Sequence, residues 1–178
     1  MRKRTVIVEG PDGAGKSELI RVLAEGLGRN PSHTGGPRAT KEGVDEAMRM
    51  VEVRKAGLFD RCSHISNPIY ASVDGREDPF TLGEYRTRLA SFNPIVVYCR
   101  LRNVDQMLSH ILTTVKAHKP PSYLEIVKAN YPRIVSLYDE HMTEIEKIVP
   151  VIRYSWNEAH PLLVLRAIRE IEQTQEGE

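Results

Sequence analysis

Glycine, lysine and serine recur near the start of the chain in a spacing suited to binding phosphate. The run follows apolar residues 6–8 and opens a segment with helical periodicity. Glycines let successive backbone N–H groups converge on one anion, Lys16 can reach the outer phosphates, and the Ser17 hydroxyl is a ligand for Mg²⁺. We therefore expect a nucleoside triphosphate to bind a loop formed by Gly10, Asp12, Gly13, Ala14, Gly15, Lys16 and Ser17.

A carboxylate and an arginine end the apolar run that begins at residue 57. There Asp60 could bind Mg²⁺ directly or through water, and Arg61 could grip an anionic oxygen with two hydrogen bonds. Asp12 is not needed to cradle phosphate, so it could contact a second substrate or the metal. The plainer alternatives are an Asp60–Arg61 ion pair, which strand neighbours make poorly because they point to opposite faces, and a turn-forming role for Asp12.

Composition restricts the class of protein. The chain has 178 residues, 28% of them charged, with a net charge of +1. We expect one domain over residues 1–178, with no overall field that would steer it to nucleic acid or an acidic membrane. Cys62 and Cys99 lack metal-ligand spacing, and no apolar stretch approaches the roughly 20 residues that span a bilayer. A soluble, cytoplasmic protein without a membrane partner is the expectation.

Apolar runs alternate with segments of helical periodicity. The runs at 6–8, 58–59, 95–98 and 149–152 predict strands, and a weaker one is expected at 32–34. Helices are expected at 16–27, 41–55, 81–91, 104–117, 122–147 and 158–173, and exposed loops at 74–79 and 116–122. This alternation predicts an α/β fold with a parallel sheet covered by helices, and it places ligands beyond the carboxyl ends of the strands.

Several of these residues match a known family. A resemblance to thymidylate kinases and related viral deoxynucleoside monophosphate kinases is carried by residues 9–17, Asp60-Arg61, Ser66 and Tyr70. It implies a three-layer α/β/α fold, with five parallel strands in the order 2-3-1-4-5. It also implies that Asp12 lies near the acceptor's sugar and the metal, and that Arg61 contacts the acceptor's phosphate. Loop 34–38 resembles the family's Arg-Glu-Pro-Gly-Gly loop with its arginine displaced to Arg38. The implied acceptor contacts are Asp12, Arg38, Arg61, Ser66 and Tyr70.

The departures from that family concern a lid and the donor base. Relatives with alanine at position 14 carry catalytic arginines in a lid, here residues 113–123, where the only cationic candidates are Lys116, His118 and Lys119. Arg100 and Arg102 alternate along a strand end, so at most one faces the nucleotide, and we expect Arg102. The family holds the purine ring near residues 154–158, so Trp156 would stack on it beside Asn157; packing of the last helix on the sheet is the alternative for Trp156.

Together these features predict an ATP-dependent phosphotransferase that uses Mg²⁺. Lys16 would bridge the β- and γ-phosphates, Ser17 and Asp60 would hold the metal or its waters, and Arg61 would align the acceptor. Asp12 would select the acceptor's sugar. The expected acceptor is a pyrimidine deoxynucleoside monophosphate. The alternatives are a hydroxymethylated pyrimidine already in DNA, and a nucleotide-binding ATPase or regulator with no acceptor but water. The sequence leaves open whether the protein forms a homodimer. If the source is viral, the expected location is the cytoplasm of the host cell.

Overall fold

Five parallel strands form one sheet in the order β2-β3-β1-β4-β5, as expected. The computed structural model describes residues 3–34, 38–100, 103–115 and 121–174. The strands are β1 (Val6–Glu9), β2 (Pro31–His33), β3 (Leu58–Asp60), β4 (Ile95–Cys99) and β5 (Val151–Tyr154). Val8 lies opposite Asp60, and Glu9 lies opposite Tyr98, so the carboxyl ends of the three central strands are level.

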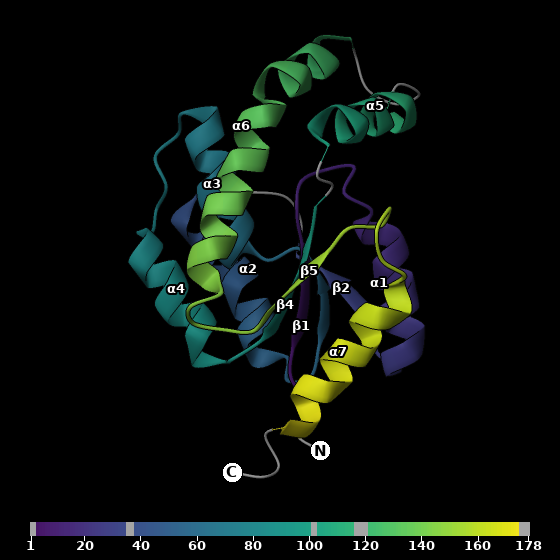
Figure 1. Ribbon diagram of the computed structural model, residues 1–178. Coiled ribbons are helices and arrows are strands. Elements are labelled where there is room, and N and C mark those ends of the chain that lie inside the picture. The colour runs from purple at the N-terminus through teal and green to yellow at the C-terminus, as the bar shows by residue number, and fades with distance from the viewer. Residues whose placement is uncertain (1–2, 35–37, 101–102, 116–120, 175–178) are drawn as a thin grey trace.

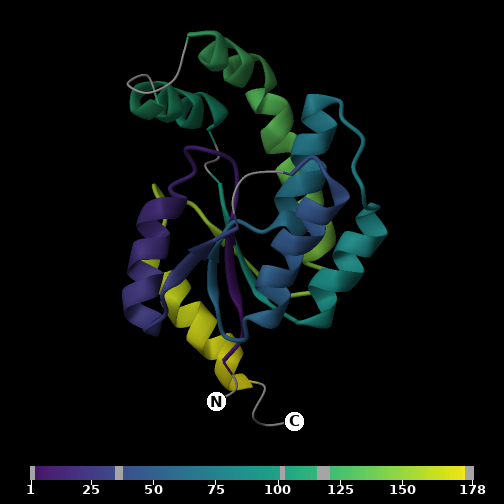
Figure 2. The same ribbon diagram turned by 180° about the vertical axis from the view of Figure 1, so that it is seen from behind.

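Helices cover both faces of the sheet. They are α1 (Lys16–Leu27), α2 (Lys41–Val53), α3 (Ser63–Asp74), α4 (Leu82–Ser91), α5 (Val104–Val115), α6 (Pro121–Ile145) and α7 (Pro161–Thr174). In Figure 1, α1 and α7 lie on one side of the sheet, and α2, α3, α4 and most of α6 lie on the other. Figure 2 shows from behind that α5 and the first turns of α6 extend beyond the carboxyl ends of the strands.

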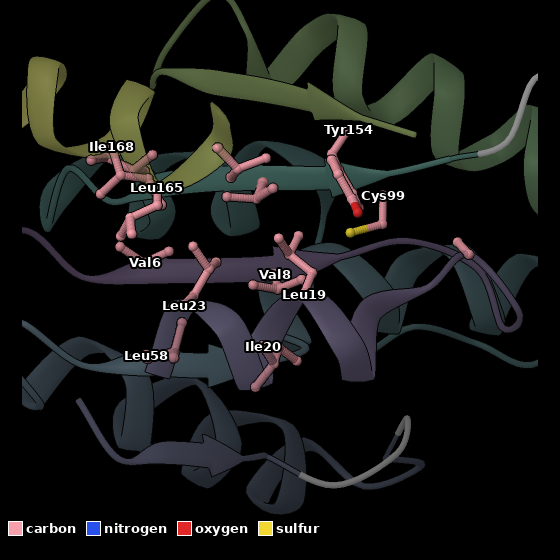
Figure 3. Packing of buried hydrophobic residues seen from close by; sticks show 14 of the residues in the cluster. Val6, Val8, Leu19, Ile20, Leu23, Leu58, Cys99, Tyr154, Leu165 and Ile168 are labelled. Atoms are coloured by element: carbon pink, nitrogen blue, oxygen red, sulfur yellow. The ribbon is translucent and has the colours of Figure 1, made fainter. Parts of the chain in front are cut away.

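Alternation along the strands divides the core in two. On β1, Val6 and Val8 face α1 and α7, where they pack with Leu19, Leu23 and Leu165 (Figure 3). Ile7 faces the opposite layer, whose core includes residues of α3, α4 and α6. Both faces of the central strand β1 are thus buried, as is usual for parallel sheets. This burial holds the end of β1, and with it the start of the following loop, in a defined position.

Helix α3 is the element that sequence analysis missed. Its sequence is poor in helix-forming residues, and Pro68 lies inside it, where it removes one backbone donor. The helix is nevertheless buried on most sides, since Ser63 to Ile69 are all buried. Packing of α3 against α2, α4 and α6 therefore outweighs helix propensity. Within the expected loop at 74–79, Asp74 is the last residue of α3.

Other differences are confined to element ends. Strand β5 lies two residues later than expected, at Val151–Tyr154, and β4 continues to Cys99. Helix α7 begins at Pro161 rather than at 158, because residues 155–159 form turns. Of the expected loop at 116–122, residues 121 and 122 belong to α6 and the remainder lies outside the described residues. No helix among the described residues is long and apolar enough to cross a membrane.

Candidate active site

The predicted phosphate loop joins β1 to the amino end of α1. Gly10, Gly13 and Gly15 have φ values of 143°, 77° and 81°, which side-chain-bearing residues rarely adopt. Gly15 is the N-cap residue of α1 and makes no side-chain capping bond. Glycines with positive φ before an uncapped helix N-terminus are the backbone features from which anion-binding concavities are built.

Lys16 is folded into this loop. Its ammonium Nζ donates to the carbonyl oxygens of Gly10 and Pro11, each at 2.7 Å, and only 8% of the residue is exposed. Burial lowers the pKa of Lys16 from its ordinary value. A phosphate in the loop would supply the charge that two neutral carbonyls do not. Ser17, the next residue, is exposed at the same helix end.

The glycines also mark where other elements touch the loop. A Cβ at Gly10 would lie 2.1 Å from the Cys99 carbonyl oxygen, at the end of β4. A Cβ at Gly13 would lie 2.6 Å from Cγ1 of Ile111 on α5, and one at Gly15 would lie 2.7 Å from Cδ1 of Trp156. The loop thus has a strand end, a helix and an indole against its three glycines, and none of these positions has space for a side chain.

Asp60 lies at the carboxyl end of β3 beside the loop, on the α1 side of the sheet. Its Oδ1 is buried without a hydrogen-bond partner among the described residues, and Oδ2 lies 3.4 Å from Nδ1 of His33 on β2. An unpartnered buried carboxylate oxygen suits Mg²⁺, which takes few protein ligands and completes its shell with phosphate and water. The described residues contain no cluster of three or more His, Cys, Asp or Glu that could hold a metal by themselves.

Arg61 does not pair with its neighbour Asp60. Its backbone has a φ of 70°, a left-handed conformation that is rare for such a residue. The guanidinium pairs with the Asp12 carboxylate, while only 13% of the arginine side chain is exposed. The Tyr70 phenol adjoins the guanidinium, and burial raises the pKa of Tyr70 to about 12 against the opposing effect of Arg61. The fold brings Asp12, Arg61 and Tyr70 together from three segments.

Glu9 ends β1 beneath this group and is fully buried. Its carboxylate accepts hydrogen bonds from the backbone N–H of Cys62 at 2.6 Å, the N–H of Gly10 at 3.1 Å and the Tyr138 hydroxyl at 3.2 Å. Burial raises the pKa of Glu9, although Arg61 opposes the shift. Glu9 therefore connects the start of the phosphate loop to the start of α3, and both of its carboxylate oxygens already accept hydrogen bonds within the protein.

Arg38 and Ser66 occupy the acceptor side in different ways. The Arg38 backbone N–H donates to Oδ1 of Asn67 at 2.9 Å, and its guanidinium reaches the Thr34 carbonyl at 3.4 Å, so the segment after β2 is attached to α3. Ser66 is 3% exposed, and its hydroxyl donates to the Cys62 carbonyl at 3.1 Å. Substrate contact by either residue stays a prediction. Residues 35–37 lie outside the described residues.

Trp156 lines a cavity of about 540 Å³ next to the loop. Its indole is 43% exposed, and its ring centroid lies 6.3 Å from that of His110 on α5. Asn157 is exposed, accepts from the Ser155 hydroxyl at 2.5 Å and lies 3.4 Å from Oε1 of Gln106. The tryptophan is thus placed at the donor loop, with one surface still accessible. Whether a base stacks there stays a prediction.

The predictions for cationic residues near the donor are tested only in part. Arg100 pairs with Asp139 on α6 at 2.8 Å, in the layer opposite α1. Arg102, the expected nucleotide contact, lies outside the described residues, as do Lys116, His118 and Lys119 of the expected lid. Of the span 113–123, the structure places residues 113–115 in α5 and residues 121–123 in α6.

Sequence analysis missed two groups of polar contacts. Tyr131 of α6, whose helical spacing favours core or interface packing, donates its hydroxyl hydrogen bond to the Asp12 carbonyl. Cys62 Sγ lies 3.0 Å from Nδ1 of His64, whose Nε2 lies 2.9 Å from Oε1 of Glu52. Burial raises the pKa of the Cys62 thiol well above its usual value and lowers the pKa of His64, so this chain of contacts is structural rather than nucleophilic.

Comparisons with known proteins agree with this architecture. The structure is similar to YorR from Bacillus subtilis, solved with phosphorylated GDP, with a TM-score of 0.69 and 17% identity over 98% of both chains. It is similar to deoxyadenosine kinase from M. mycoides, solved with dCMP and dCDP (TM-score 0.60, 17% identity, covering 96% of this chain and 98% of that one).

Shikimate kinase from Acinetobacter baumannii, solved with shikimate, is a further similar structure (TM-score 0.58, 17% identity, covering 97% of this chain and 94% of that one). No protein-family model and no curated protein matches the sequence. At this level of identity the likeness concerns the fold. The chain has the three-layer α/β/α fold that P-loop kinases share.

Proposed function

We propose that the chain is an ATP-dependent kinase that transfers the γ-phosphoryl group of Mg-ATP to a nucleotide. The observation that carries the proposal is the loop at residues 10–17, in which three left-handed or extended glycines and a buried lysine lie at the amino end of α1. Such a loop concentrates backbone donors and one cation on a triphosphate. The kinase fold of the similar structures supports this reading.

The chain's own residues would act by positioning and by neutralising charge. Lys16 would leave the carbonyls of Gly10 and Pro11 for the β- and γ-phosphate oxygens, where its charge opposes the charge that builds up during transfer. Ser17 and the unpartnered Oδ1 of Asp60 would hold Mg²⁺ or its waters. Bound there, the metal would supply charge neutralisation on the phosphates. No covalent intermediate with the protein is required.

The acceptor side favours a substrate that is already ionised. A hydroxyl acceptor needs a base to take its proton, whereas a monophosphate does not. Near Arg61, Glu9 has its oxygens occupied by three hydrogen bonds, and Asp12 is paired with the arginine itself. An incoming phosphate could take over Arg61 and release the Asp12 carboxylate for the acceptor's sugar. We therefore propose a deoxynucleoside monophosphate, with a pyrimidine base as the resemblance to thymidylate kinases implies.

The remaining predicted binding residues are given roles in the same scheme. Tyr70 beside Arg61 would line the acceptor's space, together with Arg38 and Ser66. The cavity bounded by Trp156 and His110 would receive the donor's base, with Asn157 at its rim. The deoxyadenosine kinase neighbour was solved with dCMP and dCDP, which are deoxynucleotides of the class proposed here. The cytoplasmic setting stays a prediction.

One experiment separates the possible acceptors. The purified protein is incubated with ATP labelled on its γ-phosphate, in separate reactions with each deoxynucleoside monophosphate, with deoxynucleosides, and with DNA containing hydroxymethylated pyrimidines. We expect label in a deoxynucleoside diphosphate. Label only in DNA would replace the free nucleotide by a polymer acceptor. Label only in inorganic phosphate, at a rate independent of every acceptor, would overturn the kinase proposal in favour of an ATPase or regulator.

A further inference from the structure

Tyr131 connects a distant helix to the backbone of the phosphate loop. It lies on α6, is 1% exposed, and donates its phenolic hydrogen bond to the Asp12 carbonyl, 119 residues away in the sequence. The bond is made to the backbone, so the side chain at position 12 does not determine it. A buried tyrosine usually finds some partner for its hydroxyl, but here the partner belongs to the most constrained loop of the molecule.

The geometry of the peptide bond gives this contact a consequence at the next residue. A trans peptide is planar, and its C=O and N–H point in opposite directions. Holding the Asp12 carbonyl toward α6 therefore turns the Gly13 N–H away from α6. Gly13 has a φ of 77° and no side chain, so its own conformational preferences restrain this peptide weakly. An external hydrogen bond supplies the missing restraint.

Other contacts hold the same two residues. The Asp12 carboxylate pairs with Arg61, and the Cα of Gly13 lies against α5, where a Cβ would be 2.6 Å from Ile111 Cγ1 and 3.0 Å from the Met107 carbonyl oxygen. These contacts bear on the position of the peptide rather than directly on its rotation about the line between the two Cα atoms. The Tyr131 hydrogen bond acts on the carbonyl itself and therefore restrains that rotation directly.

We propose that Tyr131 is a positioning residue that orients the Asp12–Gly13 peptide so that the Gly13 N–H faces the phosphate of the bound nucleotide. This inference rests on the proposed function, because it needs a phosphate in the loop. Tyr131 acts through the peptide and is not assigned a contact with either substrate. Its loss should weaken binding of the donor's phosphates and leave binding of the acceptor unchanged.

The test compares Tyr131→Phe with Tyr98→Phe. Tyr98 is also 1% exposed, and its hydroxyl donates to Asp139 of α6 at 2.8 Å, so both variants remove one phenolic hydrogen bond that involves α6. Only Tyr131→Phe removes one that ends on the loop. Calorimetry with Mg-ATP and with ADP should give about 3- to 10-fold weaker binding for Tyr131→Phe, and no change for Tyr98→Phe. The KM for the donor should rise by a similar factor, with that for the acceptor unchanged.

A merely structural role for Tyr131 would give a different pattern. It would lower the Tm of the free protein, as Tyr98→Phe is expected to do, while each variant kept the full rise in Tm on adding Mg-ATP. Equal nucleotide affinities in the two variants would overturn the proposal. Failure of the unmodified protein to bind any nucleotide would instead overturn the proposed function.

Hydrogen exchange on the unmodified protein keeps the test decisive if Tyr131→Phe does not fold. Nuclear magnetic resonance follows exchange of the Gly13 amide with and without ADP and magnesium. A Gly13 N–H that faces the phosphate should exchange at least about tenfold more slowly when nucleotide is bound. An exchange rate that is unchanged at Gly13 while it slows at the amides of residues 15–17 would show that this peptide points elsewhere.

Discussion

Buried charges are arranged differently at the amino ends of the strands, here called the amino edge of the sheet, and at their carboxyl ends, here called the carboxyl edge. At the amino edge, the Glu172 carboxylate accepts from the Arg4 N–H at 2.8 Å and from Arg29 at 2.7 Å, while the Arg4 guanidinium reaches the carbonyls of Asn93 and Pro94. At the carboxyl edge, the Lys16 ammonium donates to two neutral carbonyls, and Asp60 Oδ1 has no hydrogen-bond partner within the described part of the chain. At the amino edge Arg29 and Glu172 form a buried ion pair, whereas at the carboxyl edge Lys16 and Asp60 Oδ1 leave charge that a ligand could complete, next to the Arg61–Asp12 pair.

This difference predicts which charges serve folding and which serve the proposed chemistry. An ion pair whose members are both buried contributes its attraction in the folded state itself, and it is costly to break. A buried lysine ammonium or carboxylate oxygen without a direct ionic partner is typical of a site where a ligand supplies the missing charge. The amino edge should therefore respond to mutation through stability and the carboxyl edge through activity.

The largest expected effect is on the carboxyl edge. Lys16→Ala should lower phosphoryl transfer by about 10³-fold or more, because it removes the cation proposed to neutralise the transferred group. Circular dichroism and Tm should stay close to those of the unmodified protein. Lys147→Ala is the matched control, since Lys147 is exposed and forms an ion pair with Glu144 at the surface. An active, folded Lys16→Ala protein would contradict the site.

At the amino edge the expected effect is on stability. Glu172→Ala should lower the free energy of unfolding by about 3–5 kcal/mol, because Arg29 would remain buried without its carboxylate. Denaturant titration measures the change. The control is Glu170→Ala, which breaks an exposed pair with Arg166 and should have no measurable effect. Activity per folded molecule should not change in either variant; a fall for Glu172→Ala would mean that the two edges are not independent.

A smaller effect is expected from the pH dependence of stability, at the contact between His64 of α3 and Glu52 of α2. Burial lowers the pKa of His64 in the folded state below its ordinary value of 6.5, so the unfolded chain binds a proton more readily there. This part of the stability is complete above about pH 6.5 and is lost as the pH falls below it. Unfolding titrations between pH 7.5 and 5 should show a shallower decline for His64→Gln than for the unmodified protein. The exposed His160→Gln variant should retain the full slope.

Much of the carboxyl edge could be predicted from local sequence. The loop at residues 10–17 is contiguous, its glycines satisfy local backbone requirements, and the strand before it and helix after it have clear periodicity. The alternation of strands and helices predicted a parallel sheet, and the resemblance to thymidylate kinases implied its strand order. The structure confirms both. Helix α3 was not predicted, because Pro68 and its polar neighbours have low helix propensity. Burial against other elements determines its conformation instead.

What the sequence determined by itself was the phosphate loop, the alternation of strands and helices, and the presence of Asp60-Arg61 after a strand. Each follows from properties of neighbouring residues. Only the tertiary structure decided that Arg61 pairs with Asp12 rather than with Asp60, that Trp156 lies against Gly15, and that Tyr131 reaches the Asp12 carbonyl. These contacts join segments 49 to 141 residues apart, and packing of whole helices on the sheet sets their distances.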